Sequence, residues 1–495
     1  MTRILPMQLK IWTEGELYQT KRHAADPERF YSSVSTDTRS ILEGEVFVPL
    51  VGDHFDGHDF LEAAAQKGAA MLVIEAHAKK LSQWLKKIEK DESAPDVLVV
   101  QDTGKAYRDI ARGFRTTLSA NIIGVTGSVG KTTTRRMIYQ MIESQLKAEQ
   151  SARNYNNQIG LPKTILTTEL DTQALVAELG MARRGEIALL SEVARPDIAV
   201  ITQIGMSHAE YLGSMSDILD EKTSIISGMK DNGLLIVNGD DPMLESWMLR
   251  EQPTVPVWFI ASEQNVGRLE RDGVPVFWAE HVRMDRDGLS FIGRSNLTPD
   301  ERWPIFLSVP GLHLVPAVMF GLAVVYAMGL NMQVAATSAS RYKPADSRQE
   351  LAAIGPVDVM DDAYNASPES LHSALESASL LSENNRRFVA VIGGLRELGR
   401  YSVEAHEDAA VGLLNAGVEL VFLVGEETKT TRDYLLQSEE GASILAGWYP
   451  TCEKAIPEIL KQLLPGDFML LKASRFYELE KVKEALLEHH KKGRI

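Results

Sequence analysis

One short segment limits the fold of this chain more than any other. The run GVTGSVGKTTT, residues 124–134, follows the apolar stretch NIIGV and leads into KTTTRRMIYQMIESQL, whose apolar residues recur with a helical period. A strand, a glycine-rich turn and a helix in this order are typical of a phosphate-binding loop, because backbone N–H groups and the helix N-terminus surround phosphate oxygens. The sequence therefore predicts a nucleotide site in a parallel α/β domain.

The loop also offers side chains for phosphates and for a cation. Gly127 and Gly130 let backbone N–H groups point inward. Lys131 can reach the β- and γ-phosphates, and Thr132 can hold Mg²⁺. The usual spacing has a glycine where Val125 stands, so a structural turn with an incidental lysine is the alternative, and the flanking strand and helix weigh against it. The predicted nucleotide-binding residues are Thr126, Gly127, Ser128, Val129, Gly130, Lys131 and Thr132.

Candidate metal-binding and catalytic groups follow the next strands. Glu178 closes the apolar strand ALVAE, so its carboxylate is expected at the carboxyl edge of the sheet, where ligands of open α/β sheets bind. By position alone, a glutamate that only caps a loop is an equal alternative. His208 follows the strand that begins at Ile198, and Lys222 lies on the helix after it. For these two, the ordinary interpretations are a surface or hydrogen-bonded histidine and a solvated lysine.

The length and the alternation of strands and helices indicate several domains. At roughly 150 residues per domain, 495 residues suggest about three. We place boundaries near Ala120 and Tyr342, which divides the chain into residues 1–119, 120–341 and 342–495. The fold class is α/β, with a smaller and less regular first domain, a central parallel sheet that carries the phosphate loop, and a Rossmann-like C-terminal domain. Beyond the first strand, strands are expected at residues 174–178, 198–203, 234–238, 357–360, 388–392, 420–424 and 468–471.

Composition and charge exclude several classes of protein. Hydrophobic residues at 44% and charged residues at 24% are ordinary for a globular chain with a real core. The formal net charge of −16 repels nucleic-acid phosphates and anionic membranes, so no nucleic-acid partner is expected. Cys452 is the only cysteine, which excludes a disulfide framework and a cysteine-rich zinc site and favours a reducing cytoplasm.

No membrane insertion is expected either. The longest apolar run, residues 315–330, contains Pro316 and Gly321 and is shorter than the roughly 18 to 20 residues that a membrane span needs. It predicts a buried helix. The N-terminal residues lack the apolar core and small-residue cleavage site of a secretory signal.

A series of motifs, in chain order, resembles a known family along nearly the entire chain. They are STDTRSILEGEVFVPLVGDHFDGHDF, then TGSVGKTTT, NYNNQIGLP, AELGMARRGEI and SHAEYLGSMSDILDEK, and finally SRQELAAIGPVDVMDDAYNASPES, GGLRELGRYSVEAH and LLKASR. In this order they resemble the Mur ligases of peptidoglycan synthesis. The Asp-Asn-Pro-Arg signature of the member that adds the third amino acid is absent from the chain.

The resemblance implies an activity for each domain. It implies an ATP-dependent, ADP-forming ligase that uses Mg²⁺ and joins D-alanyl-D-alanine to UDP-N-acetylmuramoyl-tripeptide through an acyl phosphate. Residues 1–119 then bind the UDP-sugar-peptide, residues 120–341 form the ATPase domain, and residues 342–495 bind the amine. The partners are small molecules, and we expect a cytoplasmic monomer.

The resemblance also assigns residues to these ligands. The catalytic residues are Lys131, Glu178, His208 and Lys222, and the metal ligands are Thr132, Glu178, His208 and Lys222. In several relatives the lysine at the place of Lys222 is carbamylated and helps to hold a second Mg²⁺. Asn157, His313 and Arg348 join the nucleotide-binding set, and Glu397 and His406 match the pattern without an assigned role. The substrate-binding residues are Asp37, Thr38, Arg39, Asp56, Gly57 and His58 in the first domain and Asp362, Tyr364, Asn365, Lys472, Ser474 and Arg475 in the third.

Four positions depart from the family pattern and leave two alternatives. Leu314 and Ala317 replace amides expected near the nucleotide base, which motivates a non-catalytic nucleotide-binding paralogue as one alternative. Gly394 replaces an aspartate and Ala473 a glycine, which motivates a Mur-type ligase with a different amine substrate. The paralogue is disfavoured by the joint retention of Lys131, Thr132, Glu178, His208 and Lys222.

Overall fold

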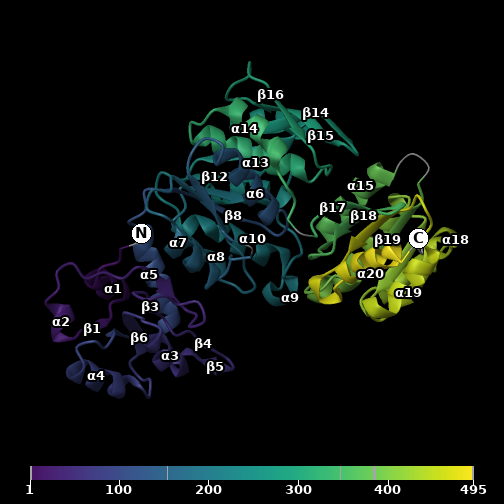
Figure 1. The fold of residues 1–495 in the computed structure, drawn as a ribbon. Coiled ribbons are helices and arrows are strands. Elements are labelled where there is room, and N and C mark those ends of the chain that lie inside the picture. The colour runs from purple at the N-terminus through teal and green to yellow at the C-terminus, as the bar shows by residue number, and fades with distance from the viewer. Residues whose placement is uncertain (1–2, 153, 272, 346, 383–385, 493–495) are drawn as a thin grey trace.

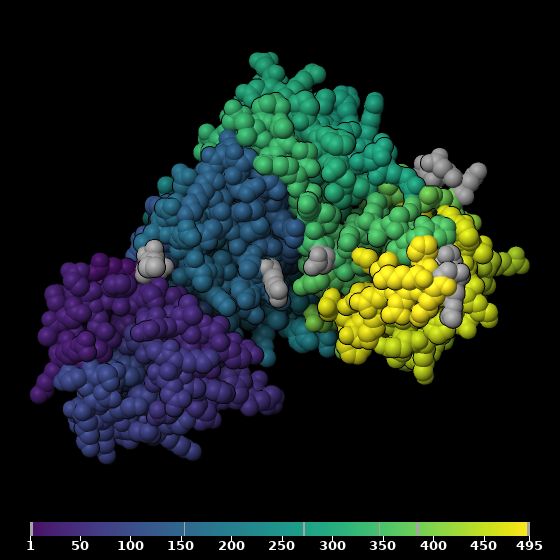
Figure 2. All heavy atoms as spheres, in the orientation of Figure 1, coloured from purple at the N-terminus to yellow at the C-terminus, as the bar shows by residue number. Residues whose placement is uncertain are grey.

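The computed structural model describes residues 3–152, 154–271, 273–345, 347–382 and 386–492. Three bodies follow one another along the chain, each with its own sheet (Figure 1). The central body carries the phosphate loop and contacts both of the others. On the face shown in Figure 2, the N-terminal body touches the central one, and the C-terminal body lies on its other side. The predicted three-domain α/β fold is confirmed.

The N-terminal body contains a five-stranded sheet in the order β1-β7-β6-β3-β2. Its strands are β1 (Glu16–Tyr18), β2 (Val34–Ser35), β3 (Val46–Phe47), β6 (Met71–Glu75) and β7 (Asp96–Val100). Its helices are α1 (Pro6–Thr13), α2 (Lys21–Ala24), α3 (Leu61–Gln66), α4 (Leu81–Lys90) and α5 (Thr103–Arg115), and a separate hairpin joins β4 (Val51–Gly52) to β5 (Phe55–Asp56). Strands as short as two residues carry little hydrophobic pattern, which is why this region looks irregular in the sequence.

The central body is built on a nine-stranded sheet in the order β16-β15-β14-β13-β12-β11-β8-β10-β9. The strands are β8 (Asn121–Thr126), β9 (Ala148–Gln150), β10 (Ala174–Glu178), β11 (Ile198–Ile201), β12 (Leu234–Asn238), β13 (Val257–Ser262), β14 (Val276–Asp285), β15 (Gly288–Ser295) and β16 (Trp303–Leu307). All are parallel up to β14, and β15 and β16 extend the sheet antiparallel. This extension is not predicted, because only the alternation of parallel strands and helices was visible in the sequence.

Helices cover both faces of the central sheet. One face packs on α6 (Lys131–Ile142), α13 (Leu314–Ala327) and α14 (Met332–Ser338), and the other on α5, α7 (Gly160–Thr167) and α8 (Glu186–Ala194). The helix after the loop ends at Ile142, earlier than the sequence pattern indicated. The apolar run is the buried helix α13, as predicted, and among the described residues no helix is long and apolar enough to cross a membrane. The remaining central helices are α9 (Ala209–Leu212), α10 (Met215–Thr223), α11 (Pro242–Glu251) and α12 (Glu263–Arg271).

The C-terminal body has a six-stranded sheet in the order β17-β18-β22-β19-β20-β21. Only the edge strand β17 is antiparallel to its neighbour. The strands are β17 (Glu350–Ile354), β18 (Val357–Asp362), β19 (Phe388–Gly393), β20 (Leu420–Val424), β21 (Leu445–Tyr449) and β22 (Phe468–Lys472). The helices are α15 (Pro368–Ser382), α16 (Ser402–Asn415), α17 (Lys429–Leu435), α18 (Glu439–Ile444), α19 (Cys452–Gln462) and α20 (Glu480–Lys491). The parallel strands end at one edge, which faces the central body.

The turn between β14 and β15 reaches the C-terminal body (Figure 1). Arg286 in this turn forms an ion pair with Asp358 of β18, and Arg386 pairs with the same carboxylate. The unpredicted antiparallel extension of the sheet therefore carries one of the contacts between the two bodies.

Candidate active site

The phosphate loop lies between the end of β8 and the start of α6. Gly127 and Gly130 have φ angles of 146° and 85°, which residues with a side chain rarely adopt. A Cβ atom on Gly127 would lie 2.0 Å from Oγ1 of Thr202, so only glycine fits there. The Lys131 ammonium lies across the loop and donates to the carbonyls of Gly127 at 2.6 Å and Ser128 at 3.1 Å. Burial lowers the pKa of Lys131, while the Glu178 carboxylate raises it.

Glu178 ends β10 beside the phosphate loop, at the carboxyl edge of the sheet. Its carboxylate accepts hydrogen bonds from the Thr132 hydroxyl and from the Asn156 amide, both at 3.0 Å. Arg135 of α6 lies 3.4 Å from the same carboxylate. The predicted Asn157 instead turns its side chain towards the start of α7, where Oδ1 accepts from two backbone N–H groups. Asn156 and Arg135 are not among the residues predicted from the sequence, although Asn156 lies within NYNNQIGLP and Arg135 directly follows TGSVGKTTT.

Lys222 is not a solvated lysine. It lies on α10 with 1% of its surface exposed. Burial, and after it the nearby Lys131 charge, hold its pKa well below the ordinary value, while Glu221 and Glu178 act in the opposite direction. The ordinary interpretation from sequence was therefore wrong, because the helical pattern did not reveal that this position faces the interior.

His208 lies at the junction of the central and C-terminal bodies. Its Nδ1 atom is 2.6 Å from Oε2 of Glu397, which belongs to the C-terminal body. Burial, followed by the charge of Lys131, lowers the pKa of the imidazole, and Glu397 raises it. His208 therefore touches both bodies, whereas its place after a strand predicted only a position at the edge of the central sheet.

A cavity of about 840 Å³ lies between the central and C-terminal bodies and brings together most of the candidate residues. The predicted residues that line it are Ser128, Val129, Gly130, Lys131, Thr132, Glu178, His208, His313, Arg348, Asp362, Tyr364, Asn365 and Lys472. Thr126, Gly127, Asn157, Lys222, Ser474 and Arg475 are not part of the lining. The phosphate loop and the candidate amine-binding residues thus face one shared cavity.

The C-terminal wall of the cavity is built where β18 and β22 end. Lys472 pairs with Asp362 at 2.7 Å and also donates to the carbonyl of Asn365 at 2.9 Å. Burial raises the pKa of Asp362 and lowers that of Lys472, and their mutual attraction opposes both shifts. The guanidinium groups of Arg348 and Arg475 lie 4.3 and 5.6 Å from the centre of the Tyr364 ring. The wall therefore carries a fixed charge pair and an aromatic ring flanked by cations.

The nucleotide-side wall includes the start of α13. Burial lowers the pKa of His313 to about 4, so this imidazole is neutral. Ala317 lines the cavity, whereas Leu314 is buried in the core with 1% of its surface exposed. Of the two positions that lack the amide of the family pattern, only Ala317 therefore lines the cavity.

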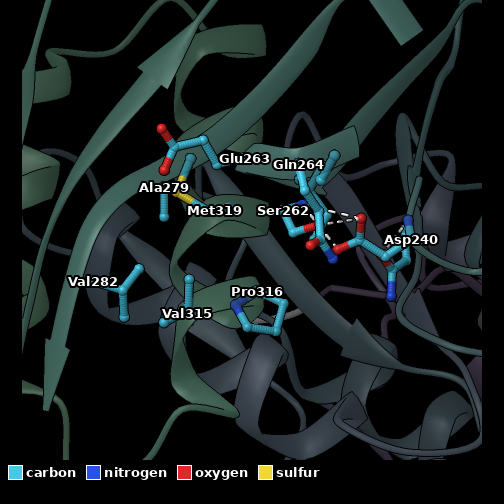
Figure 3. Close-up of a pocket in the computed structure, with 12 residues that line it drawn as sticks. Asp240, Ser262, Glu263, Gln264, Ala279, Val282, Val315, Pro316 and Met319 are labelled. Atoms are coloured by element: carbon cyan, nitrogen blue, oxygen red, sulfur yellow. Dashed lines mark hydrogen bonds between the residues drawn. The ribbon is translucent and has the colours of Figure 1, made fainter. Parts of the chain in front are cut away.

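A second cavity of about 730 Å³ adjoins the first and shares Asn238 and Pro316 with it. Figure 3 shows its apolar side, formed by Ala279, Val282, Val315, Pro316 and Met319. Its polar rim carries Asp240, Ser262, Glu263 and Gln264, and the Asp240 carboxylate accepts hydrogen bonds from Ser262 (Figure 3).

The predicted residues of the N-terminal body form two local groups. Arg39 pairs with Asp37 at 2.7 Å, and this hydrogen-bonded contact lowers the pKa of Asp37 to about 2. The Thr38 carbonyl accepts from Lys67. His58 is buried, with Nδ1 2.6 Å from Asp56 and Nε2 accepting from the Glu75 backbone.

Gly57 allows a close approach of two chain segments, since a Cβ atom there would lie 2.6 Å from the Leu50 carbonyl oxygen. The Asp56-Gly57-His58 motif therefore holds the local fold through internal contacts, and Asp37 and Arg39 are the more exposed pair.

Comparison with known proteins covers all three bodies. Residues 30–115 match the model "Mur ligase family, catalytic domain", residues 125–325 match "Mur ligase middle domain", and residues 347–475 match "Mur ligase, glutamate ligase domain". UDP-N-acetylmuramoyl-tripeptide--D-alanyl-D-alanine ligase of Bacillus subtilis (strain 168) is 31% identical over 458 residues, 92% of this chain and 93% of the relative. The chain belongs to the Mur ligase family.

Solved structures of Mur ligases share the fold over nearly the whole chain. MurF from Acinetobacter baumannii superposes with a TM-score of 0.81 at 24% identity and covers 99% of both chains. MurF ligase from Thermotoga maritima in complex with ADP has a TM-score of 0.76 at 25% identity and covers 93% of this chain and 98% of the other. The three-body arrangement is thus that of the Mur ligases.

Proposed function

We propose that this Mur ligase joins D-alanyl-D-alanine to UDP-N-acetylmuramoyl-tripeptide and converts ATP to ADP and phosphate. Relatives that span nearly all of the chain carry the name of this activity, and the T. maritima structure is a complex with ADP. The observation that carries the proposal is the shared cavity, in which the phosphate loop faces Asp362, Tyr364 and Lys472.

The chemistry needs an activated carboxyl group, because a carboxylate is a poor electrophile. A carboxylate oxygen of the tripeptide attacks the γ-phosphorus of ATP, ADP leaves, and an acyl phosphate forms. The amine of the dipeptide then attacks the acyl carbon, loses a proton, and phosphate leaves. Lys131 and the N-terminus of α6 stabilise the negative charge on the transferring group, because both lie at the loop that surrounds it.

The residues beside the loop fit a magnesium ion. Thr132 and Glu178 present a hydroxyl and a carboxylate oxygen 3.0 Å apart, and Mg²⁺ in nucleotide sites takes one or two such oxygens besides phosphates and water. Bound there, the ion would neutralise charge on the phosphates. Lys222 is a candidate for carbamylation, since its lowered pKa favours the neutral amine that reacts with carbon dioxide. His208 completes the proposed set.

The substrates are proposed to divide among the bodies at residues 119/120 and 341/342. The N-terminal body binds the UDP-sugar-peptide, with Asp37 and Arg39 close enough to the central body for Lys163 of α7 to act on the Asp37 carboxyl. The C-terminal wall binds the dipeptide. Its Lys472 charge suits the dipeptide carboxylate, and Tyr364 provides an apolar surface for the methyl groups. We also propose that the enzyme acts as a cytoplasmic monomer.

Phosphate release tests this function. The enzyme is given ATP, Mg²⁺ and UDP-N-acetylmuramoyl-tripeptide with D-alanyl-D-alanine or with a panel of other amines. Release that depends on the dipeptide supports the proposal, release with another amine supports a changed acceptor, and no release with any amine supports the non-catalytic paralogue.

One observation bears on the changed acceptor. A Cβ atom on Gly394 would lie 2.8 Å both from Oε2 of Glu427 and from the Tyr477 hydroxyl. The hydrogen-bonded side chains of Glu427 and Tyr477 therefore occupy the space that the aspartate of the family pattern would need at position 394. A carboxylate thus remains near this place in the C-terminal body, which favours the original acceptor over a changed one.

A further inference from the structure

The segment that carries His208 makes three polar contacts with the C-terminal body. The Met206 N–H donates to Oε1 of Glu369 at 2.8 Å, and the Glu210 N–H donates to the Glu397 carbonyl at 2.9 Å. Between them, Nδ1 of His208 lies 2.6 Å from Oε2 of Glu397. Residues 206–210, called here the His208 turn, therefore belong to the central body by sequence and also have polar partners in the other body.

The His208 turn and its partner both adopt an unfavourable backbone conformation. His208 has a φ of 64° and Glu397 a φ of 63°, in the left-handed region that residues with side chains rarely occupy. Such conformations persist where the surrounding structure holds them, and they concentrate at functional sites. Here the surroundings that hold each residue include the opposite body.

Glu397 itself is fixed from within the C-terminal body. The neighbouring Leu395 N–H donates to Nε2 of His406 at 3.1 Å, and the Arg396 N–H donates to Oγ of Ser474 at 2.9 Å. Ser474 follows β22, whose last residue Lys472 lines the cavity. The loop that carries the Glu397 carboxylate is thus hydrogen-bonded to the segment that follows β22, beside the candidate amine site.

We propose that Glu397 of the C-terminal body is a positioning residue for His208 of the central body. The charge of the Glu397 carboxylate beside Nδ1 restrains the position of the imidazole, and His208 also lines the cavity. The kinetic part of this inference rests on the proposed function.

Glu397→Gln tests the contact, because it keeps the size of the side chain and removes its charge. We expect kcat for phosphate release to fall about 10- to 100-fold, as when other groups that orient a functional histidine are removed, with little change in KM for ATP or the dipeptide. Glu397→Asp retains the charge and is expected to recover part of the loss. Glu210→Gln is the matched control, since the Glu210 N–H donates to the Glu397 carbonyl and this substitution leaves that backbone hydrogen bond in place.

Two measurements separate positioning from a merely structural role. If Glu397 acts through His208, its replacement has little further effect in a His208→Ala background, so the losses do not multiply. Hydrogen exchange of residues 206–212 needs no turnover, and it should be faster in Glu397→Gln than in the wild type or in Glu210→Gln. Wild-type kcat with unchanged exchange, or losses that multiply, overturns the inference. A wild-type enzyme that releases no phosphate contradicts the proposed function instead, and exchange then still tests the contact.

Discussion

At the scale of single residues, two lysines of the candidate active site have ordinary positions in a loop and a helix but unusual surroundings. Lys131 is a loop lysine whose pKa burial lowers, and Lys222 is a helix lysine whose pKa burial holds well below its ordinary value. Both environments arise from the same packed region between the phosphate loop and α10. Charge at this place is costly unless an anionic ligand or a modification balances it.

Lys131→Ala is expected to abolish ligation without unfolding the protein. The substitution removes a positive charge from an open turn, so we expect a loss in kcat of roughly a hundredfold or more. Phosphate release and a thermal melt measure the two effects. A folded variant that turns over normally would contradict the assignment of the phosphate loop.

Ala317 is expected to weaken the choice between nucleotide bases. Because it lines the cavity without an amide, ATP should be preferred over GTP only modestly, and Ala317→Asn should raise the preference by about tenfold, the worth of one buried hydrogen bond. The ratio of kcat/KM for the two nucleotides measures this, with Ala317→Ser as the control. Rejection of GTP by several orders of magnitude in the wild type would contradict the expectation.

At the scale of elements, strand ends position the candidate groups. Glu178 ends β10, Asp362 ends β18 and Lys472 ends β22, so the carboxyl edges of two separate sheets form the two walls of one cavity. The loop after β18 carries Asn365, whose carbonyl is held by Lys472. The side chain of Asn365 is exposed and lines the cavity.

Asn365→Ala is expected to raise the apparent requirement for D-alanyl-D-alanine while leaving affinity for the UDP-peptide nearly unchanged. The two contacts belong to separate bodies, so their effects should be close to additive. Steady-state titration of the dipeptide and equilibrium binding of the UDP-peptide test this. Equal loss of both ligands would rule out the proposed division among the bodies, and an unchanged titration would show that Asn365 only holds its own turn.

At the scale of the whole molecule, the central and C-terminal bodies meet through polar contacts and through side chains such as Met206, Met284 and Tyr401, which pack against the hydrophobic core of the opposite body. The Arg286–Asp358 pair joins the β14–β15 turn to β18, and the His208 turn meets Glu397 at another point of the same interface. Interfaces of this kind permit relative motion of domains. Opening and closing about the chain segment near Tyr342 is therefore compatible with entry and release of substrates.

Arg286→Met is expected to have only a small effect. Its side chain is 46% exposed, and exposed ion pairs contribute about 0 to 1 kcal/mol, so kcat/KM should fall by less than about fivefold. Arg386→Met is the control within the C-terminal body and should instead act on thermal stability. A loss of activity in Arg286→Met as large as that in Lys131→Ala would show that the β14–β15 turn governs closure.

The sequence by itself determined the parts of this protein that depend on local pattern. The phosphate loop, its strand and helix, the strand that ends in Glu178 and the buried helix α13 all follow from glycine placement and hydrophobic periodicity, which act between near neighbours in the chain. The ordered motifs pointed to the family for the same reason, because each is a short run of residues.

Only the tertiary structure decided which residues meet. It placed Asn156 on the Glu178 carboxylate, buried Lys222, and set Glu397 against His208 across two bodies. It also added the antiparallel strands β15 and β16 and the contact made by Arg286. Such proximities join residues far apart in the sequence, and they are fixed by the packing of whole sheets and helices, which leaves no signature in a local pattern.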